Sequence, residues 1–204
     1  TLRELPGYRQ TLLFLIAYLL YNDGVQSVIT LSASYADKEL ELSEEVRITA
    51  ILMVQFVAFG GALLLGRLAG RYGTKRVVLA SLVLWTAVVG LAYFLPVRAQ
   101  LQFYLLAAAI GIVLGGTQAL SRSLYSHLIP VGKEAEYFGL YEISEKGTSF
   151  IGPLVFGLSL QLTDSYRAAI LSLVIFFVAG YVLLARVDLR RGIAEAGNPV
   201  PHKI

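Results

Sequence analysis

The sequence predicts an all-α integral membrane protein with six transmembrane helices, and three observations support this fold class. First, the 204 residues are 56% hydrophobic and 15% charged, whereas a soluble domain is about 45–50% apolar and about 25% charged. Second, the apolar residues gather in six runs close to the length of about 20 residues that crosses a bilayer. Third, Lys and Arg concentrate in alternate loops, as oriented membrane helices require.

The six predicted spans cover residues 8–34, 46–68, 77–95, 101–125, 137–162 and 167–187. They form one domain over residues 1–191, which leaves no room for a soluble catalytic domain. The fifth span is the least regular because Glu142, Glu145 and Lys146 interrupt it. If that stretch were a loop, residues 150–162 alone would be too short to cross. The sixth span would then carry the wrong flanking charges, so we predict six spans.

The basic residues predict the orientation. Twelve Lys and Arg lie in the N-terminus, the second and fourth loops and the tail, and four lie in the other three loops. Cytoplasmic loops retain such an excess, so we expect a multi-pass protein of the cell membrane, or cell inner membrane, with both termini cytoplasmic. The chain begins at Thr1 without a signal peptide, and we interpret it as a fragment. Residues 192–204, with two prolines, are predicted to be a disordered polar tail.

Several classes of function are disfavoured by the composition. The net charge of +3 could suit nucleic acid, but the basic residues sit in short loops and not in a patch on a soluble fold. The chain has no cysteine and two histidines, so we predict no metal site and no cofactor. No span places a serine beside a plausible base, and we therefore predict that the protein is not an enzyme.

The first loop between spans is rich in acidic residues. They could form a ligand site, but a solvated loop that begins the next helix explains them better, because Ser43 and the two acids after it suit a helix N-terminus. The acidic residues are Asp37, Glu39, Glu41, Glu44 and Glu45.

The loop between the second and third spans combines glycines with cations. Glycines at a helix end permit close approach and a tight turn, so the residues alone indicate a tight basic loop. The residues that define it are Gly66, Arg67, Gly70, Arg71, Gly73, Lys75 and Arg76.

This loop resembles the signature of the major facilitator superfamily, Gly-x-Leu-x-Asp-Arg-x-Gly-Arg-Arg, although Gly70 stands where the family usually has aspartate. The runs at 17–29 (AYLLYNDGVQSVI), 111–141 and 152–157 (GPLVFG) are similar to the vacuole-effluxer-like branch of bacterial and fungal permeases, related to autophagy-associated amino-acid exporters. The resemblance implies the C-terminal half of a twelve-helix transporter, built of two inverted three-helix repeats, with a missing N-terminal six-helix half as partner.

Polar residues inside the first span are candidates for the substrate or ion path. Such groups are costly at membrane depth and usually mark function. Asn, Asp and Gly together weaken a helix, which suggests either an interrupted helix at a binding site or a structural kink. The candidates are Tyr21, Asn22, Asp23 and Gln26.

The fourth and fifth spans supply the other candidates. Glu142, Glu145 and Lys146 share one helix face, where a Glu142–Lys146 pair could be a static link or the charged wall of the path. Gln118 is assigned to the path and Arg122 to a cytoplasmic gate. The Gly111–Gly115 spacing is more typical of helix packing than of ligand binding.

The predicted function is secondary transport of a small polar solute by alternating access across the lipid bilayer. The resemblance suggests an amino acid, and proton coupling through Asp23, Glu142 or Glu145 is a further hypothesis. The alternative is a membrane-embedded assembly domain without transport activity.

Overall fold

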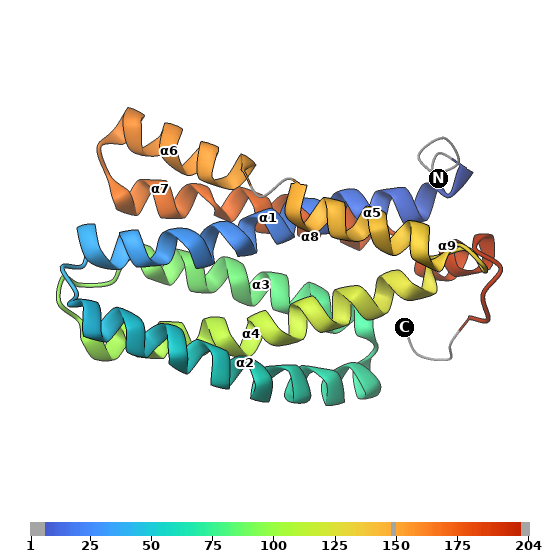
Figure 1. Cartoon of the computed structure of the whole chain (residues 1–204), viewed down its shortest axis with the longest axis horizontal. Coiled ribbons are helices and arrows are strands. Elements are labelled where there is room, and N and C mark those ends of the chain that lie inside the picture. Colours follow the sequence, from blue (N-terminus) through green and yellow to red (C-terminus); the bar gives the residue numbers. More distant parts are fainter. Residues whose placement is uncertain (1–6, 148–149, 201–204) are drawn as a thin grey trace.

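The computed structural model describes residues 7–147 and 150–200, with the backbone alone for residues 144–147. In that part of the chain nine α-helices follow one another without a strand (Figure 1). They are α1 (Arg9–Lys38), α2 (Glu44–Tyr72), α3 (Thr74–Tyr93), α4 (Gln100–His127), α5 (Glu134–Gly147), α6 (Ile151–Thr163), α7 (Tyr166–Ser172), α8 (Val174–Arg186) and α9 (Leu189–Glu195).

Five helical segments are long and apolar enough to cross a membrane. They are α1, α2, α3, α4 and the continuous pair α7–α8, Tyr166–Arg186. These segments correspond to five of the six predicted spans. The fold is therefore all-helical and of the multi-pass membrane type in the described residues.

The predicted fifth span is divided between two helices. α5 has 14 residues and α6 has 13, and each is shorter than the roughly 20 residues needed to cross a bilayer. The two helices follow one another along the long axis of the molecule, α5 in the half that holds the termini and α6 in the other half (Figure 1). The number of crossings thus depends on whether α5 and α6 act as one span.

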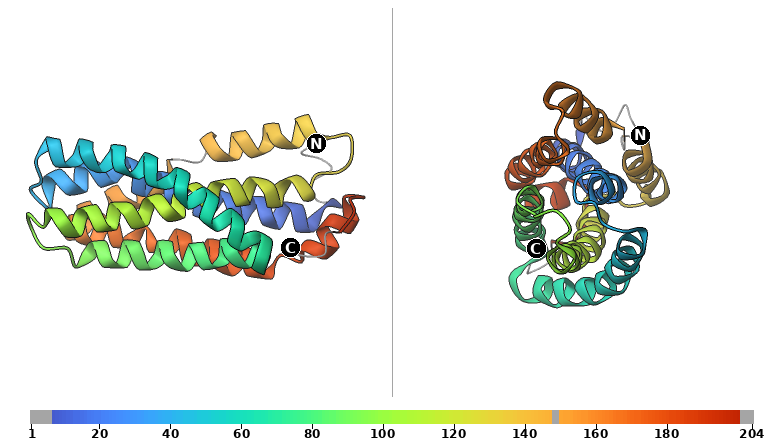
Figure 2. Two further views of the ribbon diagram at one scale, coloured as in Figure 1. Left: turned by 90° about the horizontal axis from the view of Figure 1, so that it is seen from below. Right: turned by 90° about the vertical axis from the view of Figure 1, so that its left-hand side faces the viewer.

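The two ends of the bundle carry different connections. The termini end holds the start of α1, the α2–α3 turn, the α4–α5 loop and α9, while the opposite end holds the α1–α2, α3–α4 and α6–α7 loops (Figures 1 and 2). Gly73 makes the α2–α3 turn with φ of 95°. Because this backbone angle favours glycine, the predicted glycine turn is confirmed.

Helices α2 and α4 pack with almost no space between their backbones. A Cβ atom at Gly61 would overlap the carbonyl oxygen of Ile112, and one at Gly115 would overlap that of Ala58. At Gly111 a Cβ would lie 2.9 Å from the Val57 Cβ. The predicted packing role of Gly111 and Gly115 is therefore confirmed.

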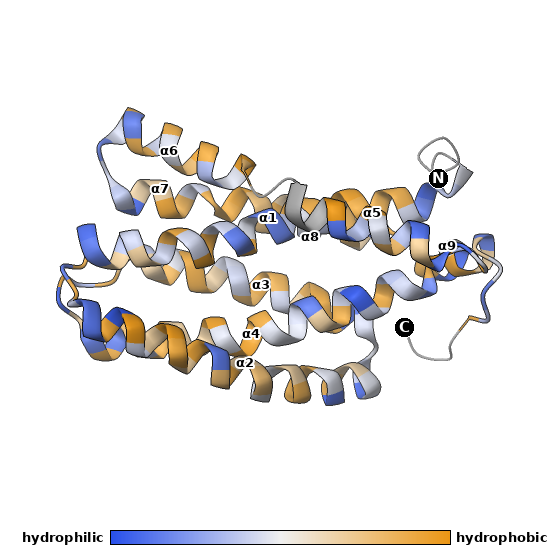
Figure 3. Cartoon of the chain, viewed as in Figure 1, coloured by the Kyte–Doolittle hydropathy of each residue, from blue (hydrophilic) through white to orange (hydrophobic). Residues whose placement is uncertain are grey.

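The apolar surface faces outward as well as inward. Phe56 and Phe59 on α2 are 80% and 73% exposed, and Leu162 on α6 is 85% exposed. Figure 3 shows these helices carrying apolar residues along their outer surfaces. Inside, Trp85 of α3 stacks on Phe177 of α8 with ring centroids 5.4 Å apart. An apolar surface on both sides of the helices is what a bilayer solvent requires.

The chain after α8 packs against the bundle as far as it is described. Asp188 caps α9 by accepting the backbone N–H of Arg191, and Leu189 and Ile193 are buried. The Asn198 side-chain amide donates to the carbonyls of His127 and Ile129 at 3.0 and 2.7 Å. Residues 192–200 thus differ from the expected disordered tail, because Leu189 and Ile193, four residues apart on α9, and one asparagine find partners on the bundle.

Ion pairs connect the acidic segment to α2, to the α3–α4 loop and to α7. Three acidic side chains each meet an arginine, and Ser43 begins α2 without a side-chain capping bond. The pairs are Glu39–Arg167 at 2.6 Å, Glu41–Arg98 at 2.7 Å and Asp37–Arg47 at 3.1 Å. Glu44 and Glu45 thus lie in the first turn of α2 as expected, but the Ser43 side chain does not cap the helix, and the other three acids make ion pairs instead.

Candidate functional site

The polar segment of α1 stays helical. α1 runs without a break from Arg9 to Lys38, so the expected weakening at Asn22, Asp23 and Gly24 does not interrupt it. Gly24 serves packing, since a Cβ there would lie 2.8 Å from the Phe176 Cβ of α8. Tyr21, Asn22 and Asp23 are buried, while Gln26 is half-buried.

Asp23 meets the beginning of α6. Its Oδ2 accepts the backbone N–H of Gly152 at 2.7 Å. Asp23 as a whole is only 1% exposed. A helix N-terminus leaves N–H groups without partners and favours a negative charge. The carboxylate of α1 therefore satisfies the first turn of α6 from a position 129 residues away in sequence.

The other oxygen of this carboxylate has no such partner. Asp23 Oδ1 is buried and makes no hydrogen bond within the described residues. Ser27 Oγ donates to the Asp23 backbone carbonyl at 2.6 Å and not to the carboxylate. A buried carboxylate oxygen that lacks a donor is costly unless the charge is neutralised or a ligand supplies the donor.

A hydrogen-bond chain joins α1 to α4 from another face of α1, because residues two apart on a helix do not face each other. Ser121 Oγ donates its single proton to the Thr117 carbonyl at 2.6 Å, so Tyr21 must be the donor in the 2.6 Å contact between its hydroxyl and Ser121 Oγ. We call these two contacts of α1, that of Asp23 with Gly152 of α6 and that of Tyr21 with Ser121 of α4, the polar site. It links α1 to α4 and to α6.

Toward the termini end, aromatic rings fill the space between α1, α4 and α5. Tyr141 stacks on Tyr18 with centroids 4.2 Å apart and on Tyr125 with centroids 5.1 Å apart. Phe14 stacks on Tyr125 at 5.9 Å. We call Phe14, Tyr18, Tyr125 and Tyr141 the aromatic cluster. Sequence reasoning missed it, although Phe14 and Tyr18, four residues apart, share a helix face.

Arg122 and Glu142 lie at the edge of this cluster. Arg122 Nη1 is 3.5 Å from Glu142 Oε1, which links α4 to α5, and the guanidinium lies 5.4 Å from the centre of the Phe138 ring. Gln118, one turn earlier on α4, is half-buried. The side chains of Glu145 and Lys146 lie outside the described residues, so the proposed Glu142–Lys146 pair stays a prediction.

The glycine-rich loop residues divide into two groups. Gly66, Arg67, Gly70 and Arg71 are exposed along the end of α2, while Lys75 reaches across to α8. Lys75 Nζ donates to the carbonyls of Ala185 and Val187 at 3.0 and 2.7 Å. No described atom lies within 4 Å of a Cβ placed at Gly70, so an aspartate, usual in the resembled signature, would fit there.

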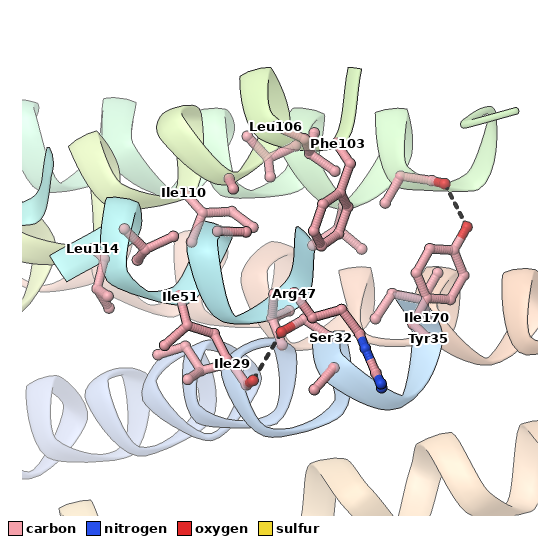
Figure 4. A pocket seen from close by; sticks show the side chains of 18 of the residues that line it. Ile29, Ser32, Tyr35, Arg47, Ile51, Phe103, Leu106, Ile110, Leu114 and Ile170 are labelled. Carbon is pink, nitrogen blue, oxygen red and sulfur yellow. Dashed lines mark hydrogen bonds between the residues drawn. The ribbon is translucent and has the colours of Figure 1, made fainter. Parts of the chain in front are cut away.

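A separate apolar cavity of about 160 Å³ lies between α1, α2, α3 and α4 near the opposite end (Figure 4). Among its polar members, Tyr35 donates to the Ala92 carbonyl at 2.6 Å and Arg47 pairs with Asp37 through Nη1, while the buried Arg47 Nε makes no hydrogen bond within the described residues. None of the predicted site residues lines it. The described residues also contain no group of three His, Asp or Glu side chains that could hold a metal.

The fold and the polar site define a multi-pass helical membrane protein with ionisable groups between its helices. Residues 1–197 match the family described as "Vacuole effluxer Atg22 like". The chain belongs to this family, a branch of the transporters of the major facilitator type. The resemblance stated from the sequence is thereby confirmed, and so is the prediction that the chain is not an enzyme.

Individual relatives agree with the family. The chain is 35% identical to an uncharacterized MFS-type transporter, YxiO, of Bacillus subtilis over 98% of its length and 47% of that protein. It is 29% identical to autophagy-related protein 22 of Kluyveromyces lactis, covering 92% of the chain and 40% of that protein. The chain thus spans less than half of these relatives. No solved structure matches it.

Proposed function

We propose that the protein is a secondary transporter that moves a small polar solute by alternating access, with this chain as its C-terminal six-helix half. Family membership supports transport, and the coverage of less than half of each relative supports a further half as partner. In this proposal the protein is a permease of the cell membrane or cell inner membrane.

The observation that carries the proposal is the contact between Asp23 and Gly152. Transporter sites commonly lie where helix ends meet inside the membrane, and an ionisable residue at that depth usually marks function. Asp23 offers one bonded and one open carboxylate oxygen at the beginning of α6. This is where a solute cation or a proton would compensate the charge.

The proposed path continues from this carboxylate along α1, α4 and α5. Arg122, whose exposed ion pair joins α4 to α5, is proposed as the gate residue. A wall with carboxylates and an ammonium suits a zwitterion, which makes an amino acid the proposed solute. The path residues are Tyr21, Asn22, Asp23, Gln26, Gln118, Glu142, Glu145 and Lys146.

The proposal treats α5 and α6 as one interrupted crossing. With 14 and 13 residues and a rise of 1.5 Å per residue, the two helices in series would measure about 40 Å. That exceeds the roughly 30 Å of hydrocarbon in a bilayer. Six crossings place both termini on one side of the membrane. The loops on that side carry the excess of basic residues, which favours a cytoplasmic location for the termini.

The test is uptake of a panel of labelled amino acids by proteoliposomes that contain the full-length protein. Asp23→Asn and Lys146→Ala should each lower uptake about tenfold or more, the effect of losing a charged hydrogen bond of about 1.5–3 kcal/mol. Asp37→Asn, which removes a charge from the opposite end, is the matched control and should retain uptake.

Two outcomes would count against the proposal. Solute binding that neither Asp23→Asn nor Lys146→Ala alters would remove the site assignment. Absence of any solute binding, with tolerance of both changes, would favour the membrane-embedded assembly domain. Proton coupling fails as a hypothesis if Asp23→Asn, Glu142→Gln and Glu145→Gln all leave pH-dependent transport intact.

A further inference from the structure

A second set of polar groups lies at the termini end, away from the polar site. There α3, α8 and α9 surround an open hollow of about 380 Å³ that carries both basic and apolar side chains. We call it the basic pocket. Its lining residues are Lys75, Ala185, Arg186, Val187, Asp188, Leu189 and Arg190.

The charge of the basic pocket is positive. Three cations and one anion line it, and the anion, Asp188, already caps α9 by accepting the Arg191 N–H at 3.1 Å. Arg186 and Arg190 are exposed, and neither makes an ion pair within the described residues. Two guanidinium groups that share a hollow and lack protein acceptors suit a phosphate, which guanidinium groups bind through paired N–H donors.

The walls of the basic pocket are held in place by packing. Lys75 uses two of its three N–H donors on the carbonyls of Ala185 and Val187, which fixes α3 to the end of α8. Gln10 of α1 accepts the backbone N–H of Asp188 at 2.8 Å. A Cβ at Gly192 would lie 2.7 Å from a Leu128 methyl carbon, so α9 lies tightly on the bundle. The backbone segments that carry the two arginines are therefore held in place before a ligand binds.

An apolar stripe leads from the basic pocket along an exposed side of α8. Val178, Val182 and Arg186 are spaced four residues apart, so they share one face of α8, and all three are exposed. A phosphate bound at Arg186 would thus have apolar surface beneath it along the helix. Free phosphate has no group that could contact this apolar stripe, whereas a phospholipid has acyl chains that could.

We propose that the basic pocket binds the phosphate headgroup of an anionic phospholipid, with an acyl chain along Val178 and Val182. Basic pockets at the ends of membrane helices suit such headgroups. The proposal goes beyond transport and does not depend on it, because lipid binding is measured directly. If the termini are cytoplasmic, the lipid belongs to the cytoplasmic leaflet.

The test is native mass spectrometry of the full-length protein with dioleoyl phosphatidylglycerol or dioleoyl phosphatidylcholine. We expect retention of phosphatidylglycerol in preference to phosphatidylcholine. The double change Arg186→Gln and Arg190→Gln should weaken phosphatidylglycerol binding roughly fivefold for each arginine. Arg186→Lys with Arg190→Lys keeps the charge but loses the paired N–H donors, so it should weaken phosphatidylglycerol binding, though less than the glutamine double variant does.

The matched control changes two arginines at the same end but on α2. Arg67→Gln with Arg71→Gln removes the same charge outside the basic pocket, and it should leave the preference in place. Equal loss in the α2 and pocket variants would overturn the proposal in favour of a general charge effect. Equal binding of the two lipids would also overturn it.

Soluble probes distinguish a lipid from a free phosphate. Inorganic phosphate and glycerol phosphate, each at millimolar concentration, should not displace phosphatidylglycerol, because they lack the acyl chain. Displacement by either would overturn the lipid assignment. Thermal unfolding of each variant verifies folding, and the single change Arg190→Gln provides the measurement if the double variant does not fold.

Discussion

The α2–α4 interface and the polar site join helices in opposite ways. Between α2 and α4, glycines bring backbone against backbone, and a Cβ at Gly61 or Gly115 would overlap a carbonyl oxygen of the other helix. At the polar site, α1 meets α4 and α6 through side chains: the Asp23 carboxylate on Gly152 and the Tyr21 hydroxyl on Ser121. The first is a dry contact of main chains, and the second is a set of hydrogen bonds that protonation or a ligand can change.

This difference between the two contacts suggests that the α2–α4 interface serves stability and the polar site serves function. Close packing of small residues holds helices together in lipid, where water supplies no hydrophobic driving force between them. A contact that depends on a buried carboxylate can instead break and form again at modest cost when its charge is compensated. We therefore expect the α2–α4 interface to move as one body and the polar site to respond to the solute.

The largest effect is expected at the α2–α4 interface. Gly61→Ala should cost about 3 kcal/mol, the upper range for overpacking, because the new Cβ would lie 2.6 Å from the Ile112 Cα and overlap its carbonyl oxygen. Gly60→Ala is the control, since no described atom lies within 4 Å of its Cβ position. The measurement is thermal unfolding in detergent; equal stability of the two variants would contradict the packing argument.

The next effect is expected at the cap of α6. Asp23→Ala leaves the buried Gly152 N–H without its acceptor, which should cost about 2 kcal/mol relative to Asp23→Asn. Asparagine keeps an oxygen for this N–H and removes only the charge. Unfolding of the two variants, compared side by side, isolates the capping bond. If alanine and asparagine unfold alike, the carboxylate does not stabilise α6.

A smaller effect is expected for the link between α1 and α4. Tyr21→Phe removes the hydroxyl that donates to Ser121 over 2.6 Å and should cost about 1 kcal/mol. A double-mutant cycle with Ser121→Ala gives the coupling energy of the pair. Additive single effects would show that the two hydroxyls do not interact.

The smallest effect on stability is expected at Arg122. The side chains of Arg122 and Glu142 are 58% and 41% exposed, so Arg122→Gln should change the unfolding free energy by less than about 0.5 kcal/mol. The same variant should nevertheless alter uptake if Arg122 is a gate residue. A large loss of stability without a change in uptake would make the pair structural.

Hydropathy predicted most of the fold. Long apolar runs located α1 to α4 and α7–α8, because a segment can span a bilayer only if it is both long and apolar enough. The same measure could not show that the fifth run divides, since it counts apolar residues and ignores backbone continuity. One local signal existed: Pro153 lies in the first turn of α6, where proline is tolerated and often begins a helix.

The candidate site was harder to predict from the sequence than the fold. The cost of burying Asp23 was foreseeable, but its partner is 129 residues away, and the Tyr21–Ser121 pair spans 100 residues. No periodicity in one sequence specifies such pairs. The chain after α8 follows the same logic: sequence reasoning missed Asp188 as a helix cap and Leu189 and Ile193 as a buried face, because the surface they cover comes from tertiary packing.

The geometry of the α2–α4 interface has a consequence for its chemistry. Each glycine carries a hydrogen where other residues carry Cβ, so the Cα–H of Gly61 points at the Ile112 oxygen and that of Gly115 at the Ala58 oxygen. In this reciprocal arrangement we expect each Cα–H to form a weak hydrogen bond worth about 0.5–1 kcal/mol. These contacts involve no ionisable group, so the affinity of α2 for α4 should be indifferent to pH, salt and membrane potential. A helix pair of that kind can serve as a constant frame while the charged contacts around it change.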